Sequence, residues 1–193
     1  MSAGRHLNAA LAAEADAYRA LLAGEDARPP LGYARDAYLA SHAETGPRSW
    51  GRLLGALKMA ILAGDGAEAI ARQAAAEARE ADSPASAYVR ALARVTLGQA
   101  PDVDAMLAAG EPFARTGRAL AALAAGDRSG YAAALSDIVA DFEARDQHLS
   151  GVAIADTALV LERLAEPRGM AVRPSGPLVP AVSAGILRPD LGL

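Results

Sequence analysis

The sequence contains no cysteine. Disulfide bonds, cysteine nucleophiles and cysteine-ligated zinc are therefore excluded. The chain has no excess of basic residues either, since its formal net charge is −4. A protein that binds nucleic acid along its phosphates needs a basic face, so we expect no nucleic-acid partner.

Long hydrophobic runs are also missing. The apolar face of residues 1–24 is interrupted by Glu14, Asp16 and Arg19. A signal peptide differs, because its centre is continuously apolar. The longest apolar stretch elsewhere, 151–161, contains an aspartate and is far shorter than the roughly 20 residues that span a bilayer. We expect a cytoplasmic protein with no membrane partner.

Sequence motifs for covalent or nucleotide chemistry are absent as well. There is no GxSxG, no SxxK, no Walker glycine loop and no GxGxxG. We therefore expect no catalytic residue, no cofactor and no enzyme activity.

The residues that are abundant favour helices. Alanine, which has the best helix propensity, is the commonest residue, whereas aromatic residues, which favour strands, make up only 4% of the 193. Apolar residues recur at helical spacing almost throughout, for example in the stripe Trp50, Leu53, Leu54, Leu57 and Ile61. The sequence predicts an all-α fold.

Glycine, proline and capping residues place the expected helix boundaries. Gly64 ends one helix, Asp65 caps the next, and Ser83 with Pro84 starts another. Asp127 opens a later helix, and Pro29 with Pro30 predicts a non-helical link over 25–32. The expected helices are one ending at Gly24, one ending at Met106, and others over about 33–44, 48–63, 65–81, 84–97, 110–126, 127–147 and 152–165.

The predicted architecture is a single helical domain of antiparallel hairpins over 1–166, followed by a Pro/Gly-rich tail over 167–193. The tail carries enough apolar side chains for us to expect that it packs on the domain. These are Met170, Val172, Leu178, Val179, Val182, Ile186 and Leu187.

The glycines that end helices recur with an average period of 34 residues: Gly24, Gly64, Gly98 and Gly126 are 40, 34 and 28 residues apart. Part of the chain resembles a tetratricopeptide repeat, which implies an array of helical hairpins. The residues that carry this resemblance are Leu62, Ala63, Gly64, Asp65, Ala69, Ile70, Ala76, Pro84, Tyr88, Ala91, Leu97 and Gly98. The alternative is an irregular Ala-rich bundle in which the glycines only cap helices.

Residues 119–182 resemble the C-terminal part of the bacterial immunity protein 49 family. The matching residues are Ala124, Ala125, Gly126, Asp127, Tyr131, Leu135, Phe142, Ala158, Leu159, Leu164, Ala165, Arg168, Gly169, Val172, Ser175, Leu178, Val179 and Pro180. The resemblance implies a helical, non-catalytic protein that neutralises a toxin by binding it. Gly176 and Pro177 stand where the family has an aromatic residue.

Candidate metal ligands gather only at 141–148, where Asp141, Glu143, Asp146 and His148 lie close in sequence. Zinc needs three or four convergent ligands, and Asp141 and Glu143 point in opposite directions on a helix. We interpret the segment as a solvated helix end with an ion pair between Asp141 and Arg145, and we expect no metal.

Two charged residues stand out because their neighbours are apolar. Lys58, the only lysine, could be a desolvated amine nucleophile, but we expect its stem to lie on apolar surface with the ammonium in water. Asp156 lies in an apolar segment and requires a partner, for which Arg163 or backbone N–H groups of the tail are the candidates. A structural role is favoured over a functional one.

These features favour a non-catalytic protein-binding domain, with toxin neutralisation as its specific form. The alternative is a helical domain that binds a small molecule or acts as an enzyme. A homodimer is compatible with Ala-rich helices. The candidate partner-binding residues are Asp137, Asp141, Arg145, His148, Asp156 and Arg163.

Overall fold

A computed structural model describes residues 3–80 and 82–180. The predicted all-α fold class is confirmed, since this part of the chain holds nine α-helices, a short 3-10 helix and no strand. The α-helices are α1 (Ala3–Ala23), α2 (Arg28–Thr45), α3 (Trp50–Ala63), α4 (Ala67–Glu77), α5 (Pro84–Thr96), α6 (Asp104–Leu107), α7 (Glu111–Ala125), α8 (Arg128–Glu143) and α9 (Asp156–Ala165).

Several helix boundaries lie where local sequence signals predicted them. Gly64 and Gly126 end α3 and α7 with φ of 74° and 72°, a left-handed conformation that glycine adopts without strain. Ser83 starts α5 with a capping box, in which its side chain accepts from the Ser86 N–H. The Asp127 carboxylate accepts from the Gly130 N–H at 2.9 Å.

The prediction of a non-helical link over 25–32 is wrong. Helix α2 begins at Arg28, and Pro29 and Pro30 lie in its first turn. Proline is compatible with that position because the first N–H groups of a helix have no partner inside the helix. Only 24–27 separate α1 from α2.

Two other helix starts differ from the prediction. Asp65 does not cap α4, which follows Gly66 without a side-chain cap, and the Asp65 carboxylate instead pairs with Arg35 at 2.9 Å. Helix α4 ends at Glu77 rather than near 81. Residue 81 lies outside the described part of the chain. Residues 152–155 precede α9 as non-helical chain, so Asp156 is the first residue of α9.

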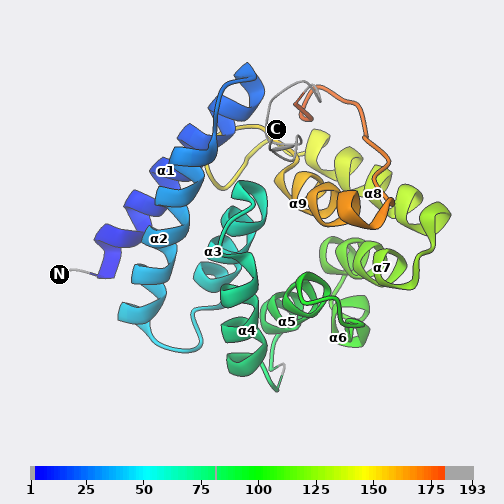
Figure 1. The fold of residues 1–193 in the computed structure, drawn as a ribbon, viewed down its shortest axis with the longest axis horizontal. Coiled ribbons are helices and arrows are strands. Elements are labelled where there is room, and N and C mark those ends of the chain that lie inside the picture. Colours follow the sequence, from blue (N-terminus) through cyan, green and yellow to red (C-terminus); the bar gives the residue numbers. More distant parts are fainter. Residues whose placement is uncertain (1–2, 81, 181–193) are drawn as a thin grey trace, which may run out of the picture.

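Small side chains dominate the face that α1 buries. Leu22 is 41% exposed, whereas its neighbour Leu21 is buried. The buried positions of α1 include Ala10, Ala13 and Ala17, which let a neighbouring helix approach closely. Helix α2 packs along α1 in this way (Figure 1).

The helices pack as antiparallel neighbours around one contiguous cluster of buried hydrophobic residues. Helices α1, α2 and α3 follow one another in space, and α7 pairs with α8 (Figure 1). Helix α9 contacts α3 as well as α7 and α8, so the end of the chain returns to its first half. In a regular solenoid each repeat touches only its neighbours, and this long-range contact departs from that pattern.

The chain after α9 lies against the helices as far as it is described. The Glu162 carboxylate, 6% exposed, accepts from the N–H of Val172 and from the N–H of Arg173 at 2.6 Å. The Ala155 N–H donates to the Leu178 carbonyl at 2.9 Å. The expected contacts of Val182, Ile186 and Leu187 lie outside the described residues.

No helix within the described ranges is both long enough and apolar enough to cross a bilayer.

Candidate functional site

A cleft with a volume of about 240 Å³ lies between the first half of the chain and helices α7, α8 and α9. Its floor is formed by polar side chains of α1, α3, α5 and the start of α9. Its rim is formed by α7, the end of α8 and the connection from α8 to α9. The lining includes Glu14, Tyr18, Lys58, Tyr88, Arg115, Thr116, Asp141, Phe142, Arg145, His148, Leu149, Asp156 and Thr157.

The floor is centred on an ion pair between Lys58 and Asp156. Lys58 Nζ lies 2.6 Å from Asp156 Oδ2 and donates to the Thr157 hydroxyl at 3.0 Å. The two charged side chains are only 12% and 15% exposed. The prediction for Lys58 is therefore wrong, since its ammonium is not in open water. The prediction that Asp156 requires a partner is confirmed, but the partner is Lys58 and neither Arg163 nor the backbone of the tail.

A second carboxylate, Glu14, shares the floor. The hydroxyl of Tyr18 donates to Glu14 Oε1 at 2.7 Å, and the hydroxyl of Tyr38 donates to Glu14 Oε2. The Tyr18 oxygen also lies 3.3 Å from Asp156 Oδ2. Glu14 is 6% exposed, although it belongs to a helix with several charged residues, and no local sequence pattern distinguishes it from them.

Lys58, Tyr18 and Tyr38 keep their protons through the neutral range. Burial alone would lower the pKa of Lys58, but the Asp156 carboxylate raises it well above its ordinary value. Burial, together with the nearby carboxylates, raises the pKa of Tyr18 and Tyr38 far above that of free tyrosine. An amine nucleophile and a tyrosine base both need a lowered pKa, so the raised pKa values do not favour either role for Lys58, Tyr18 or Tyr38.

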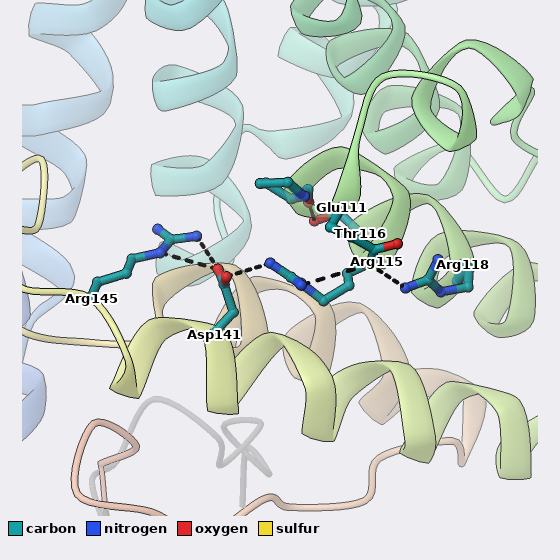
Figure 2. A network of polar contacts seen from close by, with 7 residues as sticks. Glu111, Arg115, Thr116, Arg118, Asp141 and Arg145 are labelled. Carbon is teal, nitrogen blue, oxygen red and sulfur yellow. Dashed lines mark hydrogen bonds and ion pairs between the residues drawn. The ribbon is translucent and has the colours of Figure 1, made fainter.

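Two arginines share one carboxylate at the rim (Figure 2). Asp141 Oδ1 accepts from Arg115 of α7, and Asp141 Oδ2 accepts from Arg145. The predicted ion pair between Asp141 and Arg145 is confirmed. Glu111 lies 3.7 Å from Arg115 but is closer to Arg118, at 3.1 Å.

The rest of the rim is partly apolar. The Arg145 guanidinium lies 3.9 Å from the centre of the Phe142 ring, and the ring of His148 stacks on the same phenylalanine. Leu149 is 88% exposed at the edge of the cleft. Within the described ranges, no three histidine, aspartate or glutamate side chains converge as metal ligands would.

Four of the six candidate partner-binding residues line this cleft: Asp141, Arg145, His148 and Asp156. The other two do not. Asp137 is exposed on α8 away from the lining, and Arg163 pairs with Glu166 at 3.1 Å beside Gly64.

The fold and the site together define an all-α protein with a small charged cleft. Searches against protein-family models, curated proteins and solved structures give no match for the chain.

Proposed function

We propose that this protein is a non-catalytic binding protein and that a partner protein docks on the rim of the cleft and inserts one side chain into it. Neutralisation of a toxin is the specific form of this function, and the resemblance of 119–182 to immunity proteins supports it. One observation carries the proposal: the largely buried ion pair of Lys58 and Asp156 lines a cleft.

The chemistry of the floor favours binding over catalysis. Lys58 is held as an ammonium by Asp156, and the tyrosines are held as neutral phenols by burial. Fixed charges and hydrogen-bonding groups of this kind can position a ligand without exchanging protons with it. Desolvated charges at the centre of a docking surface also discriminate strongly between partners, because a wrong group leaves them without compensation.

The rim supplies a surface around the opening. It combines arginines that contact aromatic or acidic neighbours with the exposed Leu149. Arginine and aromatic residues are enriched at protein interfaces, whereas a site for a free metabolite closes around its ligand. A protein partner therefore fits the open rim better than a metabolite does.

Site-specific photo-crosslinking in the native cell tests this proposal. A photo-reactive amino acid at Leu149 should capture one partner protein in stoichiometric yield. The same amino acid at Tyr33, which is exposed on α2 outside the cleft, should not capture it.

A charge reversal makes the test specific for the rim. Arg145→Glu should abolish the crosslink from Leu149. Arg72→Glu is the matched control, because Arg72 on α4 also follows an acidic residue by four positions and pairs with it. Equal loss in both variants, or capture from Tyr33 alone, would show that the partner does not dock on the cleft.

The second candidate function is the binding of a free small molecule. The enclosed floor, with its internal hydrogen bonds, favours it. Native mass spectrometry of the protein purified from its own cells would then detect a retained compound, and crosslinking from Leu149 would capture no protein.

A further inference from the structure

We infer that the side chain inserted into the cleft is a lysine, whose ammonium lies between Asp156 and Glu14, and that a carboxylate next to it on the partner binds Arg115 and Arg145. This inference rests on the proposed function and specifies the chemistry of the partner. It follows from the unequal distribution of charge between floor and rim.

The floor carries more negative than positive charge. Among the described side chains that line it, Glu14 and Asp156 are acidic and Lys58 is the single cation. A buried carboxylate without a compensating cation is costly. An ammonium ion that enters the cleft would give each carboxylate one cation.

The hydrogen bonds that the two floor carboxylates accept are unequal in length. The hydroxyl of Tyr18 has one proton but lies near two acceptors, Glu14 Oε1 at 2.7 Å and Asp156 Oδ2 at 3.3 Å. Asp156 Oδ1 has a contact of only 3.4 Å, with the Thr157 hydroxyl. A group that donates several hydrogen bonds fits this arrangement, and a lysine ammonium donates three.

Lys58 does not meet this need, because its donors already have partners. Its ammonium bonds Asp156 and Thr157 and lies 5.9 Å from the centre of the Tyr88 ring. A donor that enters the cleft would therefore add to the hydrogen bonds of these carboxylates rather than replace those of Lys58.

The rim has the opposite excess. Among the charged side chains of the rim that line the cleft, Arg115 and Arg145 are cationic and Asp141 between them is the single acid, which leaves one positive charge more than negative (Figure 2). Each guanidinium has five N–H donors, so both arginines of the cleft can bind another carboxylate while they keep Asp141. The inserted group is thus cationic at its tip and anionic near the opening.

The size of the cleft limits the ligand to one side chain. Its 240 Å³ lie below the roughly 300–1,000 Å³ of sites for drug-sized molecules. A lysine side chain is narrow and ends in a compact ion, whereas the planar guanidinium of arginine requires more width.

Linear probe molecules test this chemistry directly on the full-length protein. We would titrate 4-aminobutanoate, 6-aminohexanoate and 8-aminooctanoate, which carry an ammonium and a carboxylate at increasing separation. Alkylamines and alkylcarboxylates of the same lengths are the controls. Binding is followed by NMR shifts of the amide signals around Asp156 and Asp141.

We expect one of the amino acids to bind at least ten-fold more tightly than the amine and the carboxylate of its length. Glu14→Gln should weaken that amino acid and the amine about ten-fold and leave the carboxylate unchanged. Arg145→Gln should weaken the amino acid and the carboxylate, and Arg72→Gln should change nothing. Glu14→Gln removes the charge and leaves the Lys58–Asp156 pair in place, but one of the two tyrosine hydroxyls then faces an amide N–H₂ that cannot accept.

Three results would overturn the inference. The first is that no amino acid of the series binds. The second is that the carboxylates bind as tightly as the amino acids, which would leave the floor without a role. The third is that an amino acid binds but no partner protein is captured from Leu149. The natural ligand of the cleft would then be a free molecule, and the proposed protein partner would fail as well.

The first two results leave the proposed function standing where crosslinking from Leu149 still captures a partner and Arg145→Glu still abolishes it. The lysine inference and the docking proposal are therefore tested separately.

Discussion

Two buried carboxylate clusters in this protein are built from similar groups but differ in what surrounds them. On the floor of the cleft, the Tyr18 hydroxyl lies near both Glu14 and Asp156, and Lys58 pairs with Asp156. Near the tail, Glu162 accepts from the Tyr131 hydroxyl at 2.9 Å and from backbone N–H groups of Val172 and Arg173.

The two clusters differ in the groups that stabilise the negative charge of their carboxylates. Glu162 is surrounded by donors from its own chain, and it lies outside the lining of the cleft. Backbone N–H groups stabilise a carboxylate without adding a cation, so this cluster fixes the path of the chain after α9 and has a structural role. The cleft cluster contains the ionic pair and lines the cleft, and the proposed binding site rests on this difference.

The largest effect expected is that of Asp156→Asn. The variant leaves the Lys58 ammonium buried without its counter-ion, which costs about 3–5 kcal/mol of the free energy of unfolding. Urea denaturation followed by circular dichroism measures it. The double variant Lys58→Met/Asp156→Leu removes both charges and should recover most of the loss. A double variant no more stable than Asp156→Asn would show that the ion pair is not the cause.

Removal of the chain after Arg173 should have the next largest effect. It deletes the partly buried Leu178 and Val179 and the carbonyl that accepts from the Ala155 N–H. The described contacts account for about 2–4 kcal/mol, since each of these side chains loses part of its burial. The apolar surface left exposed should also promote aggregation. An unchanged melting temperature with a monodisperse elution profile would contradict this expectation.

Glu162→Gln should cost less than Asp156→Asn, about 1–3 kcal/mol, because no buried cation loses its partner. The amide N–H₂ of glutamine faces two backbone donors, so one of them loses its acceptor. Hydrogen exchange at Val172 and Arg173 should accelerate while exchange in α1 stays unchanged. If the two variants were equally unstable, the distinction between the two clusters would be wrong.

Both clusters should limit stability at alkaline pH. Burial and the adjacent carboxylates raise the pKa of Tyr18, Tyr38 and Tyr131 above the ordinary value of 10.0. Above pH 10 the unfolded chain therefore loses protons that the folded chain retains, and the free energy of unfolding decreases as pH rises. Lys58 acts in the same direction above its ordinary pKa of 10.5.

Tyr131→Phe isolates the contribution of the tail cluster. It should reduce stability by about 1 kcal/mol at neutral pH through loss of the bond to Glu162. The further loss between about pH 8 and 11 should be smaller than in the unmodified protein, since one titrating group has been removed. Urea denaturation at both pH values measures this, and an unchanged pH slope would contradict it.

Sequence alone predicted the elements whose signals are local. Gly64, Gly126, Ser83 and Asp127 mark helix ends through their own backbone or side-chain chemistry, and the helices end or begin there. Pro29 was misinterpreted because the same residue that breaks a helix interior is favourable in a first turn.

The part of the site that the sequence predicts also depends on local signals. Asp156 stood out because its neighbours are apolar, and the pair of Asp141 with Arg145 follows from their spacing. The partner of Asp156 is 98 residues away in α3, and no local pattern identifies such a contact. Glu14 was missed because α1 carries several charged residues and the sequence does not indicate which one is buried.

The smallest effect expected concerns the backbone beside Glu162. Arg173 is the only described residue other than glycine with a positive φ, at 52°, and its N–H donates to Glu162. The left-handed conformation costs a residue with a Cβ about 1–2 kcal/mol, and glycine avoids that cost but loses more entropy on folding. Arg173→Gly should therefore stabilise the protein by up to about 1 kcal/mol, measured by urea denaturation. In the Glu162→Gln background the gain should shrink, because the carboxylate no longer holds the chain in this conformation; an equal gain in both backgrounds would show that Glu162 does not impose it.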